Sequence, residues 1–182
     1  MRVRVSLLLL VAGWGASLFG ATLERLSLND MTNRSTAIVR ARAVSSSPVL
    51  IGSTIYTKTR FQVLERWKGP EGATVDVTEP GGASGQMSQN FPGVPRFSPG
   101  QELLLFLWTG PSGRTQVIGL SQGVFEVTRS AATGEVEVSR QPSGERMVAP
   151  GTGAPVEEEA ITMPLPKMVW RIQQAMERNR QR

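Results

Sequence analysis

Residues 55–69, IYTKTRFQVLERWKG, decide the fold of this chain. The odd positions, from Ile55 to Trp67, carry mostly apolar or threonine side chains, whereas the even positions include four basic residues. Because side chains of a strand alternate between its two faces, this period predicts a strand whose odd row is buried. Thirteen residues at about 3.3 Å each would span about 43 Å, which exceeds the width of a small domain. We therefore expect the strand to bend near Glu65, where the apolar row is interrupted, and to serve two sheets or a strongly coiled barrel.

Other segments alternate in the same way or are continuously apolar. In residues 36–44 the alternate residues Ala37, Val39, Ala41 and Ala43 predict a strand with that row buried, and SSSP at 45–48 predicts a turn after it. Further strands are expected at 22–26, 73–82, 101–108, 114–130 and 134–140. The strand at 114–130 should fold back near Ser121–Gly123, and the last segment should pair with it as a hairpin. Together these patterns predict a β-barrel domain over residues 22–140.

Two helices are expected, one near each end of the chain. Ser27 as N-cap, with Asp30 three residues later, predicts a short helix over 27–35. Residues 167–182 predict a C-terminal amphipathic helix, with Pro166 tolerated in its first turn. Its apolar stripe consists of Leu165, Met168, Val169, Ile172 and Met176. This stripe is expected to dock on the barrel; binding of a membrane surface or a partner protein is the alternative.

The segment 141–166 contains five Pro and three Gly without a sustained period, which predicts a partly extended linker. Its acidic run, Glu157–Glu159, is interpreted as a solvated patch.

The N-terminus has the layout of a secretory signal peptide. Arg2 and Arg4 precede an apolar stretch from Val5 to Phe19, and small residues follow. We expect residues 1–21 to be removed on export, which leaves a secreted or periplasmic protein that is only mildly basic. An uncleaved N-terminal anchor is the alternative, although the stretch is shorter than the ~20 residues of a membrane span.

The chain contains no Cys and no His, which excludes disulfides, thiolate nucleophiles, Cys/His zinc sites and His-based triads. A hydrolase would have to use a Ser–Lys pair or two carboxylates from among Glu65, Asp76 and Glu79. Nothing in their spacing favours either arrangement over surface charge. No cofactor and no metal are therefore expected.

The "WKG" turn and the "PGQELLLFL" strand resemble uncharacterised exported bacterial β-domains. More distantly, residues 36–128 are similar to netrin-like domains, the OB-type barrels that include tissue inhibitors of metalloproteinases. The resemblance implies a mainly β fold with minor α content, in a small, antiparallel, strongly bent barrel. Those inhibitors bind the protease zinc through an N-terminal cysteine, so their mechanism is not transferable to a chain without cysteine.

These observations favour an exported, non-enzymatic binding module of the bacterial envelope or exterior that recognises a protein or a polymer. The expected surface combines the Gly/Pro-rich loop at 81–98 with the outer row of the bent strand. Its residues are Lys58, Arg60, Arg66, Phe91, Val94 and Arg96. A polyanion- or single-stranded nucleic-acid-binding barrel is the alternative, but Phe61 and Trp67 lie in the other row, away from the basic residues.

Overall fold

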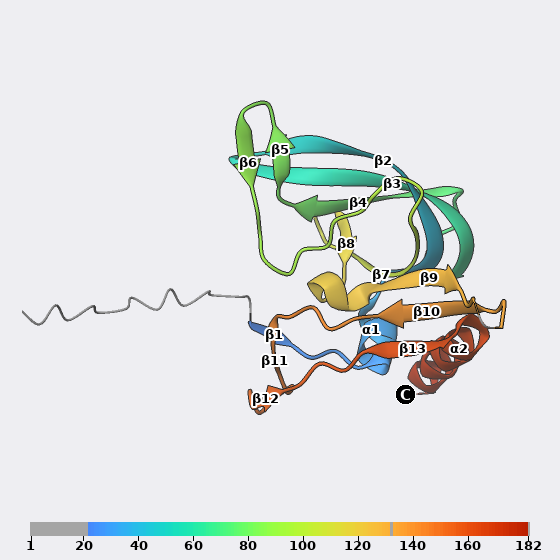
Figure 1. Cartoon of the computed structure of the whole chain (residues 1–182). Coiled ribbons are helices and arrows are strands. Elements are labelled where there is room, and N and C mark those ends of the chain that lie inside the picture. Colours follow the sequence, from blue (N-terminus) through green and yellow to red (C-terminus); the bar gives the residue numbers. More distant parts are fainter. Residues whose placement is uncertain (1–21, 132, 182) are drawn as a thin grey trace, which may run out of the picture.

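The computed structural model describes residues 22–131 and 133–181, so the predicted signal peptide lies outside the described part. The fold is mainly β with two α-helices (Figure 1). The large sheet is antiparallel and has the strand order β13-β10-β9-β7-β2-β3-β4, with β8 also paired to β7. Its strands are β2 (Ala37–Ile51), β3 (Thr54–Lys68), β4 (Thr74–Pro80), β7 (Glu102–Thr109), β8 (Thr115–Val117), β9 (Val124–Arg129), β10 (Val136–Arg140) and β13 (Ile161–Pro164). The predicted antiparallel, mainly β fold is thus confirmed.

Smaller elements complete the chain. Strand β1 (Thr22–Glu24) pairs in parallel with β11 (Arg146–Val148), which pairs with β12 (Pro155–Val156). Strands β5 (Gly82–Ser84) and β6 (Met87–Gln89) form a separate hairpin. A 3₁₀ turn, η1 (Leu120–Gly123), joins β8 to β9, at the position where the sequence predicts a bend.

The bend of β3 lies where the alternation predicts it. The pairing of β2 with β3 shifts register three times, and one shift leaves Leu64 unpaired beside Glu65. Such bulges bend a strand and increase its twist. Before the bend Phe61 is buried in the inner row, whereas beyond it Trp67 packs against a different apolar cluster. One strand therefore serves two cores, as its length requires.

Strand β7 separates these two cores, which explains its continuous apolar run. Its alternate residues point to opposite faces, and both faces are covered. The inner core, inside the coiled sheet, comprises Ala37, Val39, Ala41, Ala43, Phe61, Val77, Leu103, Leu105, Leu107 and Val117. The helix core, between the sheet and the helices, comprises Leu26, Met31, Ile38, Leu104, Phe106, Phe125, Val138, Leu165, Met168 and Ile172.

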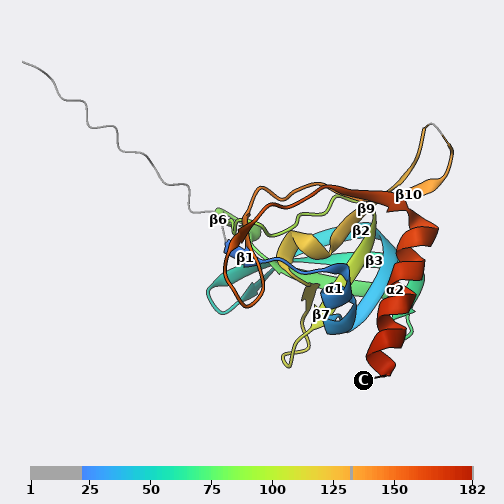
Figure 2. The same ribbon diagram turned by 90° about the horizontal axis from the view of Figure 1, so that it is seen from below.

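Both helices cover the sheet on the helix-core side and lie beside each other (Figure 2). Helix α1 (Leu28–Arg34) begins with the capping box that Ser27 and Asp30 predict. Helix α2 (Leu165–Arg180) buries Leu165, Met168 and Ile172, so the predicted docking of its stripe on the sheet is confirmed.

Four local predictions are wrong. Residues 45–48 do not form a turn, because β2 continues to Ile51 and Ser46 shares a 2.8 Å hydrogen bond with Thr59 across the hairpin. The segment 81–98 is not a loop throughout, because it contains the β5–β6 hairpin. Residues 141–166 are not a linker, because β11 and β13 both join sheets. Within this segment Glu158 is not solvated: its side chain is 7% exposed and lies 3.7 Å from Arg140.

Candidate functional site

The predicted surface residues divide into separate groups. On the outer face of β3, Lys58 and Arg60 both bind Asp76 of β4, at 2.8 and 2.9 Å. The guanidinium of Arg60 also holds the pKa of Asp76 down to about 2. These two basic residues and Arg66 line different cavities, so the structure does not gather them into one surface.

The loop residues lie elsewhere again. Phe91 is 39% exposed and Val94 is half-buried, while the Arg96 guanidinium donates to the carbonyl of Pro80 at 3.0 Å. The loop packs back on the sheet, because the Phe97 ring lies edge-on against Phe61 with centroids 5.1 Å apart. Arg96 lines a third cavity, separate from that of Arg66.

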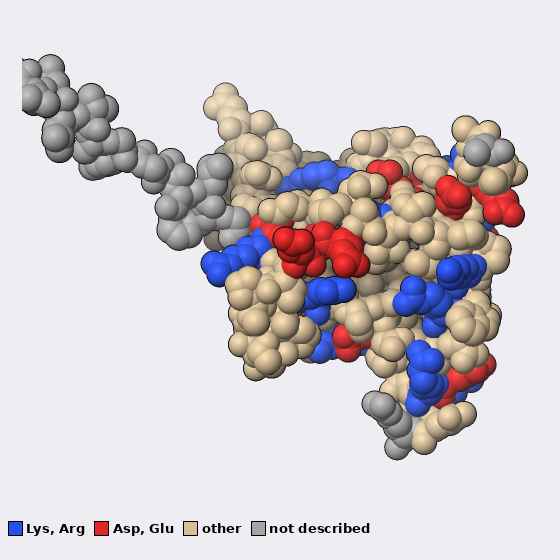
Figure 3. Space-filling model, turned by 60° about the horizontal axis from the view of Figure 1, so that its bottom comes forward, with Lys and Arg blue, Asp and Glu red and all other residues tan. Residues whose placement is uncertain are grey.

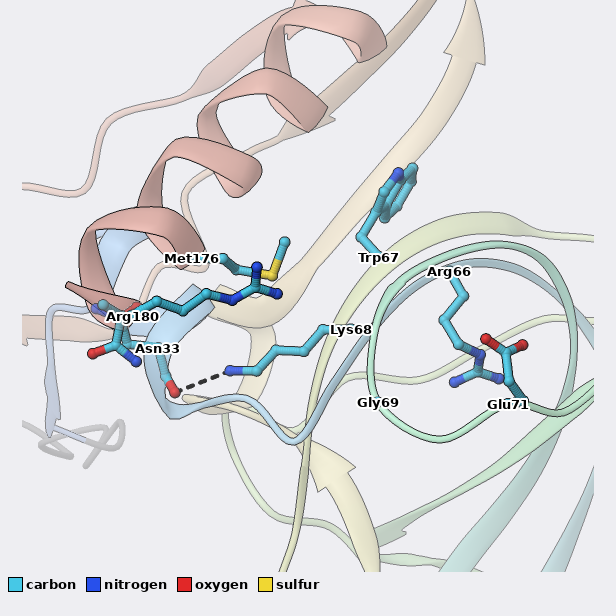
Figure 4. A pocket seen from close by; sticks show the side chains of 9 residues that line it. Asn33, Arg66, Trp67, Lys68, Gly69, Glu71, Met176 and Arg180 are labelled. Atoms are coloured by element: carbon cyan, nitrogen blue, oxygen red, sulfur yellow. Dashed lines mark hydrogen bonds between the residues drawn. The ribbon is translucent and has the colours of Figure 1, made fainter.

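Arg66 lines a cavity of about 350 Å³ between the end of β3 and the last turns of α2 (Figure 4). We call it the basic cleft; its principal side chains are Arg66, Trp67, Lys68, Glu71, Met176 and Arg180. Figure 4 shows Met176 and Arg180 extending from α2 toward Lys68, while Arg66 and Glu71 lie together beyond Gly69. Three basic side chains thus share the cavity with one acidic side chain.

The "WKG" turn brings β3 to the start of β2, and this approach requires glycine. Gly69 has φ +100°, and a Cβ atom there would lie 2.7 Å from the Cβ of Ala37 and 2.9 Å from the carbonyl oxygen of Thr36. A side chain would therefore both strain the backbone and collide with β2. The close turn places the preceding residue, Lys68, against the end of α1.

Lys68 caps that helix. Its Nζ donates to the carbonyl oxygens of Thr32 and Asn33 at 2.7 and 3.1 Å, at the negative end of the α1 dipole. Burial lowers the pKa of Lys68. An ammonium group has three donors, so one N–H remains for an acceptor in the cleft.

The two arginines differ in how they are held. The Arg66 guanidinium donates to the carbonyl of Gly72 at 3.0 Å, and this bond fixes its side chain along the turn. Within residues 22–131 and 133–181, no side chain or carbonyl accepts a hydrogen bond from the Arg180 guanidinium. A guanidinium has five N–H donors in a planar fork that matches a carboxylate, a sulfate or a phosphate. The cleft therefore has the chemistry of an anion site.

The carboxylates considered for hydrolysis do not converge. Glu65 binds Arg40 on the sheet surface, whereas Asp76 and Glu79 lie on opposite faces of β4. Glu79 is 2% exposed and accepts a 2.6 Å hydrogen bond from the Val117 amide, and burial raises its pKa to about 7. Each carboxylate thus has a partner that accounts for its position in the fold.

The chain also contains a serine motif that the sequence analysis does not identify as a candidate site. Residues 119–123, GLSQG, match the Gly-x-Ser-x-Gly pattern of strained nucleophile turns. The left-handed non-glycine residue is Leu120, at φ +56°, rather than Ser121. The Ser121 hydroxyl is buried without a hydrogen-bond partner in the described part of the chain, so no base activates it there.

No known protein family, curated protein or solved structure matches the chain. None of the helices in the described ranges is sufficiently long and apolar to cross a bilayer. The described residues also contain no group of three or more acidic side chains arranged to hold a metal ion.

Two cleft residues, Lys68 and Arg180, were absent from the predicted surface. The alternation predicts a solvated position for Lys68, and the amphipathic pattern of the C-terminal helix indicates no ligand-binding role for Arg180. No sequence signal indicates that residues so far apart share a cavity.

Proposed function

We propose that this chain is an exported, non-enzymatic binding module of the bacterial envelope or exterior, and that it recognises an acidic group in the basic cleft. The observation that carries this proposal is the Arg180 guanidinium, which lines a cavity with two other cations and has no acceptor among the described residues. An anion there would receive charge-assisted hydrogen bonds from Arg180 and from the remaining donor of Lys68.

The outer face of β3 is a weaker candidate for the same ligand. Asp76 already neutralises Lys58 and Arg60, and an incoming anion would have to compete with it. Binding of a polyanion therefore remains the alternative function, and its site would be the basic cleft at the end of β3 rather than the face near the start of β3. The netrin-like resemblance remains a prediction about the fold and implies no ligand.

Titration of ¹⁵N-labelled protein with citrate and with inorganic phosphate tests the proposal, with glycerol as the uncharged comparison. We expect chemical shifts to move at Trp67, Lys68 and the end of α2. We expect Arg180→Gln to weaken citrate binding about tenfold, equivalent to about 1.4 kcal/mol. The matched control is Arg171→Gln, which removes one charge from an exposed position of the same helix, outside the cleft. Equal binding by Arg180→Gln and the parent protein, or shifts confined to Lys58 and Arg60, would refute the proposal.

A further inference from the structure

A second cavity adjoins the basic cleft. It has a volume of about 270 Å³ and lies between α1 and the last turns of α2, where Asn29 and Arg178 contribute side chains. Asn33 and Asn179 line both cavities. Because the two cavities share these walls, they lie next to each other at the seam between the helices, and we call them together the path.

The last turn of α2 places basic residues on both sides of this seam. Successive residues of an α-helix are about 100° apart, so Arg178 and Arg180 are separated by about 200° around the axis, with Asn179 between them. Arg180 lines the basic cleft, whereas Arg178 lines the second cavity and donates to the Asn29 side-chain carbonyl at 3.0 Å. That bond uses one of the five donors of Arg178 and orients the rest.

Cations dominate the path. The acidic side chains along it are Glu71 and Asp30, and the Asp30 carboxylate is already bound by the amide and hydroxyl of Ser27 at 3.1 and 2.6 Å. This bonding lowers the pKa of Asp30. Figure 3 shows Lys and Arg side chains gathered over α2 on this side of the molecule. A ligand with repeated negative charge would therefore meet favourable potential at both ends of the path.

The lining between the cations is made of amides. Asn29, Asn33 and Asn179 each offer donors and an acceptor, which suits hydroxyl groups that also do both. We propose, on the basis of the proposed function, that the ligand is an extended acidic polysaccharide, with one acidic group in the basic cleft and another in the second cavity. Sugar hydroxyls between them would bond to the shared asparagines.

Two other polyanions fit the path less well. A peptide gains affinity mainly from apolar and aromatic anchors in dry pockets, but Met176 and half-buried Trp67 are the principal apolar side chains available. Single-stranded nucleic acid needs exposed aromatic rings for its bases. Trp170 is 60% exposed, but its position in the helix places it on the side of α2 opposite the docked stripe.

Calorimetric titration of the protein with galacturonate oligomers of one, two, four and six residues tests this proposal. We expect the hexamer to bind at least about tenfold more tightly than the monomer, because only the longer chains reach both cavities. Chondroitin sulfate hexasaccharide carries sulfate groups in addition to carboxylates, so tighter binding than that of the galacturonate hexamer would show that sulfate is recognised as well. Maltohexaose is the neutral comparison and should not bind.

Variants separate this inference from the proposed function. Arg178→Gln should reduce the ratio of hexamer to monomer affinity to about one, whereas the control Arg171→Gln should preserve it; thermal unfolding verifies that both variants fold. If citrate binds in the cleft but the hexamer gains nothing over the monomer, only the polysaccharide inference is wrong. If no acid binds, the proposed function itself fails. Tighter binding of hexaglutamate or of a six-nucleotide oligothymidylate would identify the other ligand class and overturn this one.

Discussion

Both ends of β3 carry basic residues that belong to its outer row, but the surroundings of these residues differ. Near its start Lys58 and Arg60 share the carboxylate of Asp76. At its end Arg66 and Lys68 are held by backbone carbonyls, and no carboxylate lies within ion-pair distance of either among the residues described. Alternation along a strand places cations outside the core, but the neighbouring strand or turn decides whether their charge is available to a ligand.

The basic cleft at the end of β3 depends on α2. A substitution that undocks this helix should therefore have the largest effect on stability and on binding. Ile172 is fully buried in the helix core, and Ile172→Ala should lower the free energy of unfolding by about 2–5 kcal/mol. Urea denaturation measures this, and citrate binding should weaken with it. Trp170→Ala, on the exposed side, should change stability by less than about 0.5 kcal/mol. Similar losses in the two variants would show that the helix is not docked in solution.

Two carboxylates on opposite faces of β4, Glu79 and Asp76, should change the stability of the fold with pH in opposite directions. Burial raises the pKa of Glu79 from 4.5 to about 7, against the smaller opposing effects of the Val117 amide and Arg96. Between these pH values the folded chain retains a proton that the unfolded chain has lost, so stability should fall by about 3 kcal/mol as pH rises from 4.5 through 7. Asp76 behaves in reverse, because its pKa is lowered and its contribution is lost as pH falls from about 4 toward 2.

Urea denaturation at a series of pH values measures both trends. Glu79→Gln should remove the decline between pH 4.5 and 7, and Asp76→Asn should leave that decline intact. A decline that persists in Glu79→Gln would mean that another group titrates.

Two glycines flank β3, and they should differ in their tolerance of a side chain. Gly69→Ala should destabilise the chain by about 1–3 kcal/mol and disturb the cleft, because it adds a collision with Ala37 to an unfavourable φ. Gly52, at φ +62° in the β2–β3 turn, has open space around it, so Gly52→Ala should suffer from the backbone strain alone. Thermal unfolding compares the two; equal losses would mean that the close approach of Gly69 to β2 is not tight.

The smallest expected effect comes from removing the carboxylate that pairs with Lys58 and Arg60 near the start of β3. Asp76→Asn leaves Lys58 and Arg60 without their carboxylate, so the variant should elute from heparin at higher salt than the parent protein. The shift should persist when Arg180→Gln is added, because the two ends act independently. Unchanged elution would mean that Asp76 does not limit this face.

The sequence predicts regular, long elements well because their periods are local. The alternation in β3 predicts its buried row and its bend, and Ser27 with Asp30 predicts the start of α1. It fails for Ser45–Pro48, whose composition is typical of a turn, because pairing with β3 holds these residues in a strand. It fails again in β11–β13, which are too short for a period and are held by pairing with other strands, as β11 is with the distant β1.

The candidate site is predictable only in part for the same reason. Arg66 was selected for its place in a basic row, and it does line the cleft. Arg180 reaches that cleft because α2 packs beside α1, and a contact of this kind leaves no pattern in either segment. Burial of Glu158 depends likewise on Arg140 and Ser143, in an acidic run that looks solvated on its own.

The position of α2 after the last strand of the large sheet has a consequence for biosynthesis. The strands of the large sheet precede Leu165, Met168 and Ile172 in the chain, so the side of β10 and β13 that α2 covers has no helix over it until α2 folds. A product that lacks α2 would leave Val138 of β10 and the helix-core residues beside it without this cover, which invites aggregation. Folding of α2 therefore both hides this surface and assembles the basic cleft.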